Sequence, residues 1–530
     1  MRGSLRPFYR LSRAYTSARA HLEALRGINP GILEDDHEGY ITDWTNKFSQ
    51  SVESVVARPS STYEVSMLLK YCNEHRIAVV PQGGNTGLSG ASVGLDDSLV
   101  LSMSRMNRIE AVDEVAGILS CEAGCVLQTL QERVQEYGFM MPLDLGAKGQ
   151  CQIGGNIATA AGGLNVIRYG PISRYVLGLE IVLADGTILD CDRKLFKDNM
   201  GLKIPMLFNG SEGTLGVITK VSLMLVPKPL FTAVALFTLP SFSALPEVLT
   251  AARKELGEIL SAFEFMDASS IKLLGEGKPQ LLAPFGSAVR LSGHGAVTER
   301  GEGISGEGGI LGEVSVLIAV SGSSSDAEER LQTFVHGHAH DVENKVILPR
   351  NMSQARAVWD LRESVPIALM QLSRLGREKG RLYKYDISLT LQQMTEVVAA
   401  VVSRVAESDR VPSLLVEPAC FGHCGDLNLH LNVLARPRAD VKHEEGSGGI
   451  EMELDALQDI LDKAVAEEVS CRRGSLSAEH GVGQLKKKYM PLVRGPEELR
   501  LMRSIKALFD PNGIMNPTCM LPEEITNIEY

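Results

Sequence analysis

The sequence predicts an α+β protein built from two large domains. Helix-type and strand-type patterns alternate along the 530 residues, and at about 150 residues per domain this length allows two to four domains, each with its own core. Apolar residues form 44% of the chain and charged residues 22%, a composition that excludes disorder, collagen-like repeats and coiled coils. Three glycine-rich stretches in the first half indicate that one domain holds a ligand against its backbone.

The charge balance and the cysteines exclude several classes of partner. The net charge of −12, without a long basic stripe, makes nucleic acid a poor partner. The chain contains no run of about 18 uncharged apolar residues, so no membrane span is expected. Nine cysteines, scattered from Cys72 to Cys519, do not form a disulfide framework and fit a reducing compartment.

The N-terminal segment differs from the rest of the chain. Its first 20 residues hold five arginines and four serines or threonines, but neither Asp nor Glu. Such a segment, able to form an amphipathic helix, is typical of a mitochondrial transit peptide. We therefore expect residues 1–27 to direct the protein to the mitochondrial matrix and the fold to begin near residue 30. The alternative is a basic tail without a targeting role.

The first half of the chain predicts one helix and three strands. Ser61 and Thr62 are expected to cap a helix with one apolar face. Residues 77–80 form a short β-branched run, typical of a strand. Residues 177–189 predict two strands joined at Asp185-Gly186, a dipeptide typical of hairpin turns. The buried face of the helix is expected to carry Val65, Leu68, Leu69 and Cys72.

The second half predicts further strands and helices, interrupted by two loops. The ordered elements are expected within residues 254–265, 311–321 and 423–433. Residues 293–309 and 446–449 are rich in glycine and lack apolar periodicity, so both are expected to be surface loops.

The first glycine-rich stretch, residues 81–90, is suited to an anion. Its four glycines allow tight turns that bring backbone N–H groups together, as a pyrophosphate requires. The spacing is not that of a dinucleotide-binding Rossmann loop, and no Gly-Lys-Ser/Thr sequence follows as in a Walker loop.

Two further stretches, residues 149–163 and 209–218, have the same small, polar, glycine-dense character. Such backbone packs poorly as core but can approach a large planar ligand closely. Three independent tight turns are the alternative for any single stretch, and an unsatisfactory explanation for all three together.

In this order the three stretches resemble the flavin-binding domain of the vanillyl-alcohol-oxidase-like flavoprotein superfamily, in its FAD-dependent D-2-hydroxyacid dehydrogenase branch. The resemblance runs from about Trp44 to Pro522. It implies an FAD-binding domain over residues 45–226, a mixed α+β substrate (cap) domain over 227–475 and a C-terminal segment, 476–530, that returns to the flavin. Five further motifs carry the resemblance: Ser261–Asp267, Tyr383–Asp386, Gly422–Asn432, Ser477–Gly483 and Phe509–Pro517.

The resemblance also implies which residues bind FAD. No histidine lies between His75 and His294, so a histidyl link to these loops is excluded; Cys121 and Cys125 are expected to be small buried thiols, and FAD to be bound non-covalently. The expected FAD-binding residues are Pro81, Gly83, Gly84, Asn85, Thr86, Gly87, Gly90, Ser92, Gly149, Gly154, Gly155, Asn156, Thr159, Gly163, Glu212, Gly213, Ile218 and Asn516.

A candidate metal site follows from the histidines of the second half. Residues 422–426 predict a turn, and the alternation that follows places Asn428, His430 and Asn432 on one strand face. This face is either the solvated side of an edge strand or part of a site. Two imidazoles and a carboxylate suit Zn²⁺ or a similar divalent metal and leave a coordination position open. The resemblance implies His423, His430 and Glu479 as the ligands, with Cys424 as the rival ligand.

Arg362 and Lys384 are the candidates for binding a substrate carboxylate. Arginine offers a planar pair of donors and lysine a compact charge. A helical Arg362 is more commonly a solvated charge, but the resemblance implies a substrate-binding role for Arg362, Lys384, Asn432 and His480. The chain has Pro366 where related enzymes often place a threonine, and it has extra residues before Tyr383. Both differences leave the identity of the acid open.

The resemblance implies oxidation of a D-2-hydroxyacid by hydride transfer to flavin N5. D-2-hydroxyglutarate is the expected substrate and an electron-transferring flavoprotein the expected electron acceptor. His480 is the expected base, because imidazole titrates near neutral pH; alternatively it only orients a metal ligand. The other readings are a D-lactate dehydrogenase, an FAD-family ether-lipid synthase and a non-catalytic FAD-binding relative.

Overall fold

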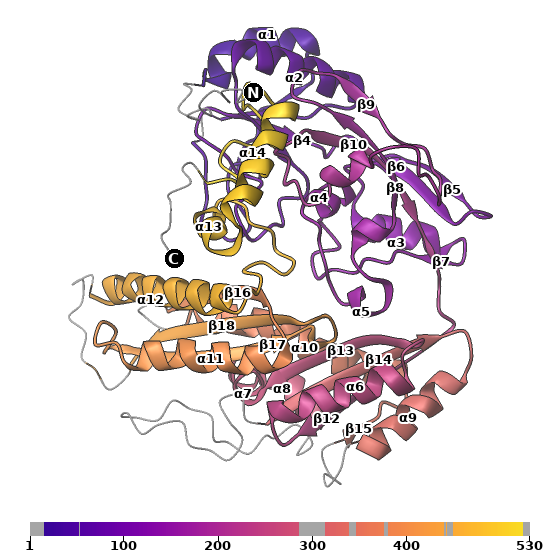
Figure 1. Ribbon diagram of the computed structural model, residues 1–530, viewed down its shortest axis with the longest axis vertical. Helices are drawn as coiled ribbons and strands as arrows, with labels where there is room; N and C mark the ends of the chain where they lie inside the picture. Colours follow the sequence, from indigo (N-terminus) through magenta and orange to yellow (C-terminus); the bar gives the residue numbers. More distant parts are fainter. Residues whose placement is uncertain are drawn as a thin grey trace, which may run out of the picture. The chain divides into compact units, whose positions relative to one another are not determined.

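The computed structural model describes residues 15–51, 54–285, 313–338, 346–375, 380–438, 441 and 449–522. The chain forms two compact units (Figure 1). The first unit comprises Met1–Gly162, Pro171–Lys228 and Glu479–Tyr530, and the second comprises Gly163–Gly170 and Pro229–Ala478. The predicted loop 293–309 and residues 446–448 lie outside the described residues.

The strands of the first unit form two sheets and a small strand pair. In the order β1-β2-β4-β3, β2, β4 and β3 are parallel and β1 is antiparallel; the order β5-β6-β10-β8-β9 is antiparallel throughout, and β11 pairs with β7. The bounds are β1 (Leu33–Glu34), β2 (Val55–Ala57), β3 (Val79–Gln82), β4 (Leu99–Ser102), β5 (Ile109–Asp113), β6 (Ile118–Glu122), β7 (Phe139–Met140), β8 (Val176–Val182), β9 (Ile188–Asp190), β10 (Val217–Met224) and β11 (Val226–Pro227).

The helices of the first unit include the one predicted at Ser61. The Ser61 side chain accepts a hydrogen bond from the Glu64 N–H, as an N-cap should, and all four apolar residues predicted for the inner face are buried. The predicted hairpin also forms, with Gly186 at φ +85°. The helices are α1 (Leu22–Ile28), α2 (Thr62–His75), α3 (Leu127–Gln135), α4 (Ile153–Ala158), α13 (Met490–Val493) and α14 (Pro496–Phe509).

Two expected boundaries differ from the structure. The strand expected at residues 77–80 begins two residues later, because its parallel pairing with β4 starts at Val79 opposite Leu99. The fold also begins well before residue 30. Leu25 of α1 is fully buried, and the Tyr15 hydroxyl donates a hydrogen bond to the Gly513 carbonyl. Residues 1–14 of the expected transit peptide lie outside the described residues, whereas residues 15–27 belong to the folded first unit.

The second unit is built on a seven-stranded antiparallel sheet with the order β15-β12-β14-β13-β17-β18-β16. Its edge strands are β15 and β16. The bounds are β12 (Phe231–Leu239), β13 (Leu260–Asp267), β14 (Val314–Gly322), β15 (Val346–Ile347), β16 (Arg381–Ser388), β17 (Leu414–Gly422) and β18 (Asn428–Pro437).

Helices cover both faces of this sheet (Figure 1). Side chains of α6, α9, α11 and α12 pack with Phe263 and Leu431 on one face; those of α7, α8 and α10 pack with Met266 and Phe421 on the other. The helices are α5 (Val166–Tyr169), α6 (Leu245–Glu255), α7 (Ala268–Gly277), α8 (Pro279–Leu282), α9 (Asp326–His338), α10 (Met352–Leu372), α11 (Leu391–Ala406) and α12 (Gly449–Cys471).

Strand β18 carries the predicted alternation, but it is not an edge strand. It lies between β17 and β16, and Asn428, His430 and Asn432 are all buried. Leu429 and Leu431 point into the opposite core. The explanation of these polar residues as a solvated edge face is therefore wrong, and the second unit buries them at the cost of their hydration.

None of the described helices is both long and apolar enough to cross a membrane.

Candidate active site

A cavity in the first unit collects the glycine-rich stretches. Counted together with the open solvent at its mouth, the space between its walls is about 920 Å³. The loop after β3, helix α4 and the turn before β10 form its walls, together with His480 from the C-terminal segment. The lining residues are Pro81, Gln82, Gly83, Gly84, Asn85, Thr86, Gly87, Ser89, Ala91, Ser92, Met103, Cys151, Gln152, Gly154, Gly155, Asn156, Ala158, Thr159, Ser211, Glu212, Gly213, Gly216, Val217, Ile218 and His480.

Most residues predicted to bind FAD lie in this lining, but four do not. Asn516 lies behind the wall, where its side-chain amide donates to the carbonyls of Ala91 and Glu212. Gly90, at φ +74°, packs against Phe48, and Gly163 belongs to the second unit. Gly149 is the fourth residue outside the lining.

The residues present fit a large polar ligand such as FAD. The Gln152 Oε1 and Asn156 Oδ1 atoms are buried and have no hydrogen-bond partner among the described residues. Such atoms normally carry hydrogen bonds, so they are suited to donors on a ligand. The Gly155 Cα lies 3.7 Å from the position that a Cβ on Gly83 would occupy, so the loop after β3 and helix α4 approach closely. On Gly84 a Cβ would lie 2.0 Å from the Gln150 carbonyl oxygen.

The thiols near the cavity are buried. The hydrogen bond to Cys125 and burial both raise the pKa of Cys121, and burial raises the pKa of Cys151. These two thiols therefore stay protonated at neutral pH and are poor nucleophiles. Cys151 lies in the cavity lining, unlike the two cysteines considered in the sequence.

Glu212 anchors the loop that carries His480. Its carboxylate accepts hydrogen bonds from the N–H groups of Val482 (2.6 Å) and Gly483 (2.7 Å). Burial raises the pKa of Glu212, and these hydrogen bonds oppose the rise. Gly483 has φ +53°, and a Cβ there would lie 2.1 Å from the Ser89 carbonyl oxygen. The Glu212 carboxylate thus binds backbone N–H groups of the protein itself, whereas the expectation from the sequence was a contact with FAD.

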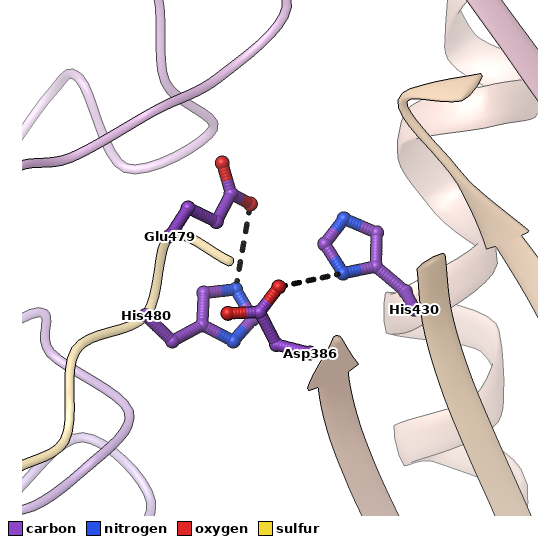
Figure 2. Close-up of side chains that lie close together, drawn as sticks. All are labelled: Asp386, His430, Glu479 and His480. Atoms are coloured by element: carbon purple, nitrogen blue, oxygen red, sulfur yellow. Dashed lines mark ion pairs between the residues drawn. The ribbon is translucent and has the colours of Figure 1, made fainter. Parts of the chain in front are cut away.

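His480 and Glu479 are adjacent in this loop. Figure 2 shows the His480 Nε2 atom paired with the Glu479 carboxylate at 3.5 Å. A Cβ on Gly162 would lie 2.7 Å from the Glu479 Oε2 atom, so the glycine at this position leaves room for the carboxylate.

A second group of predicted residues lies in the second unit, around Glu264 of β13. The Glu264 Oε2 atom lies 3.1 Å from Nε and 3.0 Å from Nη2 of Arg362. Nδ1 of His423 lies 2.9 Å from both oxygens of the same carboxylate. Arg362 is 5% exposed, so the explanation of this residue as a solvated helical charge is wrong.

His430 lies beside His423 on the same sheet face. Their ring centroids are 5.2 Å apart and their planes nearly perpendicular, at 84°. Figure 2 shows the pairing of His430 Nδ1 with Asp386 Oδ1, 3.8 Å apart across the β16–β18 ladder. Cys424, the rival ligand, is fully buried in the opposite core, and burial raises the pKa of its thiol.

Lys384 and Asn432 face each other in the β16–β18 register, two residues from the Asp386–His430 pair. Because side chains alternate along strands, all four lie on one face. Lys384 is exposed and Asn432 is buried. Glu264 and Asp386 were not predicted as site residues, although each lies inside one of the motifs Ser261–Asp267 and Tyr383–Asp386. An acidic residue at an inward-facing strand position is the signal that could have identified them.

The comparisons agree with this architecture. Residues 54–192 match the FAD binding domain, and residues 228–519 match the C-terminal domain of FAD linked oxidases. The chain therefore belongs to the FAD-linked oxidase family and is an FAD-dependent enzyme.

Its curated relatives include dehydrogenases from several kingdoms. Mitochondrial D-2-hydroxyglutarate dehydrogenase of Bos taurus is 40% identical over 508 residues, which are 94% of this chain and 83% of the relative. The enzyme of that name from Arabidopsis thaliana is 37% identical, covering 93% and 80%. A putative mitochondrial D-lactate dehydrogenase of Schizosaccharomyces pombe is 38% identical, covering 93% and 86%. These relatives confirm the expected mitochondrial location.

Solved structures confirm the fold class. An alkyldihydroxyacetonephosphate synthase has a TM-score of 0.68 at 15% identity, covering 95% of this chain and 86% of the other. The 4-ethylphenol oxidase of Gulosibacter chungangensis has a TM-score of 0.67 at 16% identity, covering 96% and 99%.

Proposed function

We propose that this protein oxidises D-2-hydroxyglutarate to 2-oxoglutarate with FAD as cofactor. The observation that carries the proposal is the placement of Arg362, Lys384, Asn432, His423 and His430 around one face of the second unit's sheet. The protein is also 40% identical, over 94% of its length, to the Bos taurus enzyme named D-2-hydroxyglutarate dehydrogenase. Such a cluster of cations and imidazoles is suited to an anionic hydroxyacid.

The lining of the first unit's cavity would hold FAD without a covalent bond. Gln152 and Asn156 would offer it their unpartnered oxygens, and the glycines would admit it close to backbone N–H groups. When bound, FAD supplies the acceptor for the hydride that leaves the substrate's Cα.

His423 and His430 would bind Zn²⁺ or a similar divalent metal, with Glu479 as third ligand. Glu479 directly follows Ala478, whose N–H donates to the Asp386 carbonyl beside His430 in the sheet (3.4 Å). Such a metal supplies a Lewis acid for the substrate hydroxyl. Cys424 is turned into the core and would not take part.

His480 would accept the hydroxyl proton. It lines the cavity of the first unit, and the Glu479 carboxylate lies 3.5 Å from its Nε2 atom. As the base, His480→Ala should slow flavin reduction by ~10²–10⁴-fold while metal and substrate remain bound. If His480 only orients Glu479, the loss should instead follow metal content and recover with added Zn²⁺.

Arg362, Lys384 and Asn432 would bind the carboxylates. Lys384 is exposed on the same strand face as Asn432 and offers a compact positive charge, and Arg362 is paired with Glu264. Substituting Lys384 with alanine should mainly raise KM, and more so for a diacid than for lactate.

Anaerobic titration of the holoenzyme tests the proposal. D-2-hydroxyglutarate should bleach the flavin absorbance, its L-enantiomer should not, and D-lactate should do so only at higher concentration. Absence of bleaching by every D-acid would contradict the proposal. Reoxidation by an electron-transferring flavoprotein, compared with oxygen alone, would test the proposed acceptor.

A D-lactate dehydrogenase is the second candidate, favoured by Pro366. This residue lies inside α10, four positions after Arg362, and has no N–H to donate to the Arg362 carbonyl. One relative is also named as a putative D-lactate dehydrogenase. A kcat/KM higher for D-lactate than for D-2-hydroxyglutarate would favour this candidate, and Pro366→Thr should then move the ratio toward the diacid.

A further inference from the structure

We infer that Glu264 is a positioning residue that orients His423 and Arg362 through one buried carboxylate. The inference rests on the metal and substrate roles proposed above. It gives β13, which carries neither a proposed ligand nor a proposed substrate contact, a direct part in arranging both.

The location of Glu264 is unusual for a carboxylate. It lies in the middle of β13, flanked by Phe263 and Phe265, which point into the opposite core, and its side chain is 1% exposed. A carboxylate buried in such surroundings needs hydrogen-bond donors around it. The Arg362 guanidinium and the His423 ring provide them, at 2.9–3.1 Å.

The contact with His423 selects one form of its ring. Because Glu264 is an acceptor, the Nδ1 atom of a neutral His423 must carry the hydrogen, which leaves the lone pair on Nε2. A metal binds imidazole through such a lone pair, and carboxylates that hold the other nitrogen commonly fix the orientation of the ring. On His430 the corresponding Asp386 contact is longer, 3.8 Å at Nδ1. The Glu264 carboxylate therefore lies closer to the ring of His423 than the Asp386 carboxylate lies to the ring of His430.

The contact between Glu264 and Arg362 fixes the orientation of the guanidinium group. Glu264 takes Nε and Nη2 of the guanidinium, and the aromatic face of Phe421 lies 4.9 Å from its Cζ atom. Two sides of the planar group are thus held. Phe421 also packs against His430, with ring centroids 5.5 Å apart. Arg362 and His423 thus share Glu264 as a partner, and Arg362 and His430 share Phe421.

A purely structural role for Glu264 would be to neutralise Arg362 inside the unit. This alternative predicts loss of stability on substitution but no specific change at His423. Glu417 of β17 provides a matched control, because it too is buried and pairs with two cations, Lys272 (3.0 Å) and Arg436. No described contact joins Glu417 to a histidine.

The test compares Glu264→Gln and Glu417→Gln in the full-length holoenzyme. Zinc affinity is measured by competition with a chromogenic chelator, and flavin content by absorbance. We expect Glu264→Gln to weaken zinc binding by about 10–100-fold, as loss of such a partner typically does, with flavin content unchanged. Glu417→Gln should leave zinc affinity within about two-fold of wild type, whatever its effect on Tm.

A second measurement needs neither metal nor a variant. In ¹⁵N-histidine NMR spectra of the metal-free protein, His423 should show the Nδ1–H form. The Nε2–H form in the wild-type protein, or equal zinc affinity in wild type and Glu264→Gln, would overturn the inference. If the wild type binds no zinc, the metal proposal fails, and the NMR result still decides the role of Glu264.

Discussion

Replacing Lys506 with methionine should destabilise the first unit far more than a surface lysine would. Lys506 lies in α14 with its side chain 13% exposed, and it donates to the Asp510 carboxylate (2.5 Å) and to the carbonyls of Thr214 and Met515 (2.6 Å each). Burial lowers the pKa of Lys506, and the neighbouring Asp510 opposes that effect. These contacts join α14 to the turn before β10, which lines the cavity of the first unit.

The magnitude follows from the partners left behind. Methionine fills a similar volume but leaves the buried Asp510 carboxylate without its cation. Among the described residues, the N–H groups of Ile514 and Met515 remain as its donors. Removing one partner of a buried ion pair costs about 3–5 kcal/mol. At roughly 2 °C per kcal/mol for a large domain, Tm should fall by about 6–10 °C.

Thermal unfolding followed by circular dichroism and by release of flavin fluorescence measures this effect. Lys463→Met is the matched control, because Lys463 forms the same i,i+4 pair, with Glu467, at 4.0 Å and with a 75% exposed side chain. Such a pair contributes less than about 1 kcal/mol. Equal Tm shifts in the two variants would refute the reasoning. The double variant Lys506→Met/Asp510→Asn should recover part of the loss, since it removes the unpaired charge.

Three further predictions concern the glycine loop of the first unit, a buried carboxylate of the second unit and the N-terminus of the mature protein. Gly84→Ala should abolish flavin binding, measured by the ratio of flavin to protein absorbance, because its Cβ would meet the Gln150 carbonyl; Gly146→Ala, with no atom within 4 Å of its Cβ, should retain the flavin. Burial raises the pKa of Asp267 to about 6, above its unfolded value of about 3.9, so ionisation destabilises the fold as pH rises through this window. Relative to Asp267→Asn, the wild type should lose about 2 kcal/mol of unfolding free energy between pH 4 and 7, and parallel pH profiles would contradict this. The N-terminus of the mature protein, read by mass spectrometry, should lie upstream of Tyr15, since a cut at residue 27 would remove the buried Leu25.

The sequence could predict local structure and chemistry where the pattern is short-range. The α2 cap, the hairpin at Gly186 and the alternation of β18 depend on neighbours within a few residues, and all three are present. The position of β18 in the sheet could not be read from its own residues, because it depends on β16 and β17 pairing on either side.

Long-range partners were the main gap. Glu264 lies 98 positions from Arg362 and 159 from His423, and no local pattern links them. The same holds for Glu212, whose carboxylate looked available for a ligand because its partners, Val482 and Gly483, come 270 and 271 residues later. A sequence shows which chemical group a side chain carries, but it does not show which distant residue binds that group.

The arrangement of the chain has a consequence for biosynthesis. The first unit is interrupted twice, by residues 163–170 and 229–478, and its last segment begins at Glu479. Its cavity wall therefore lacks His480, and Glu212 lacks the backbone it holds, until nine-tenths of the polypeptide has been synthesised or imported. Closing a loop of that length carries an entropic cost, which contacts within the second unit offset only after that unit has formed. A growing or partly translocated chain can thus complete the second unit first, and completion of the cavity wall becomes a late event, coupled to arrival of the C-terminal segment.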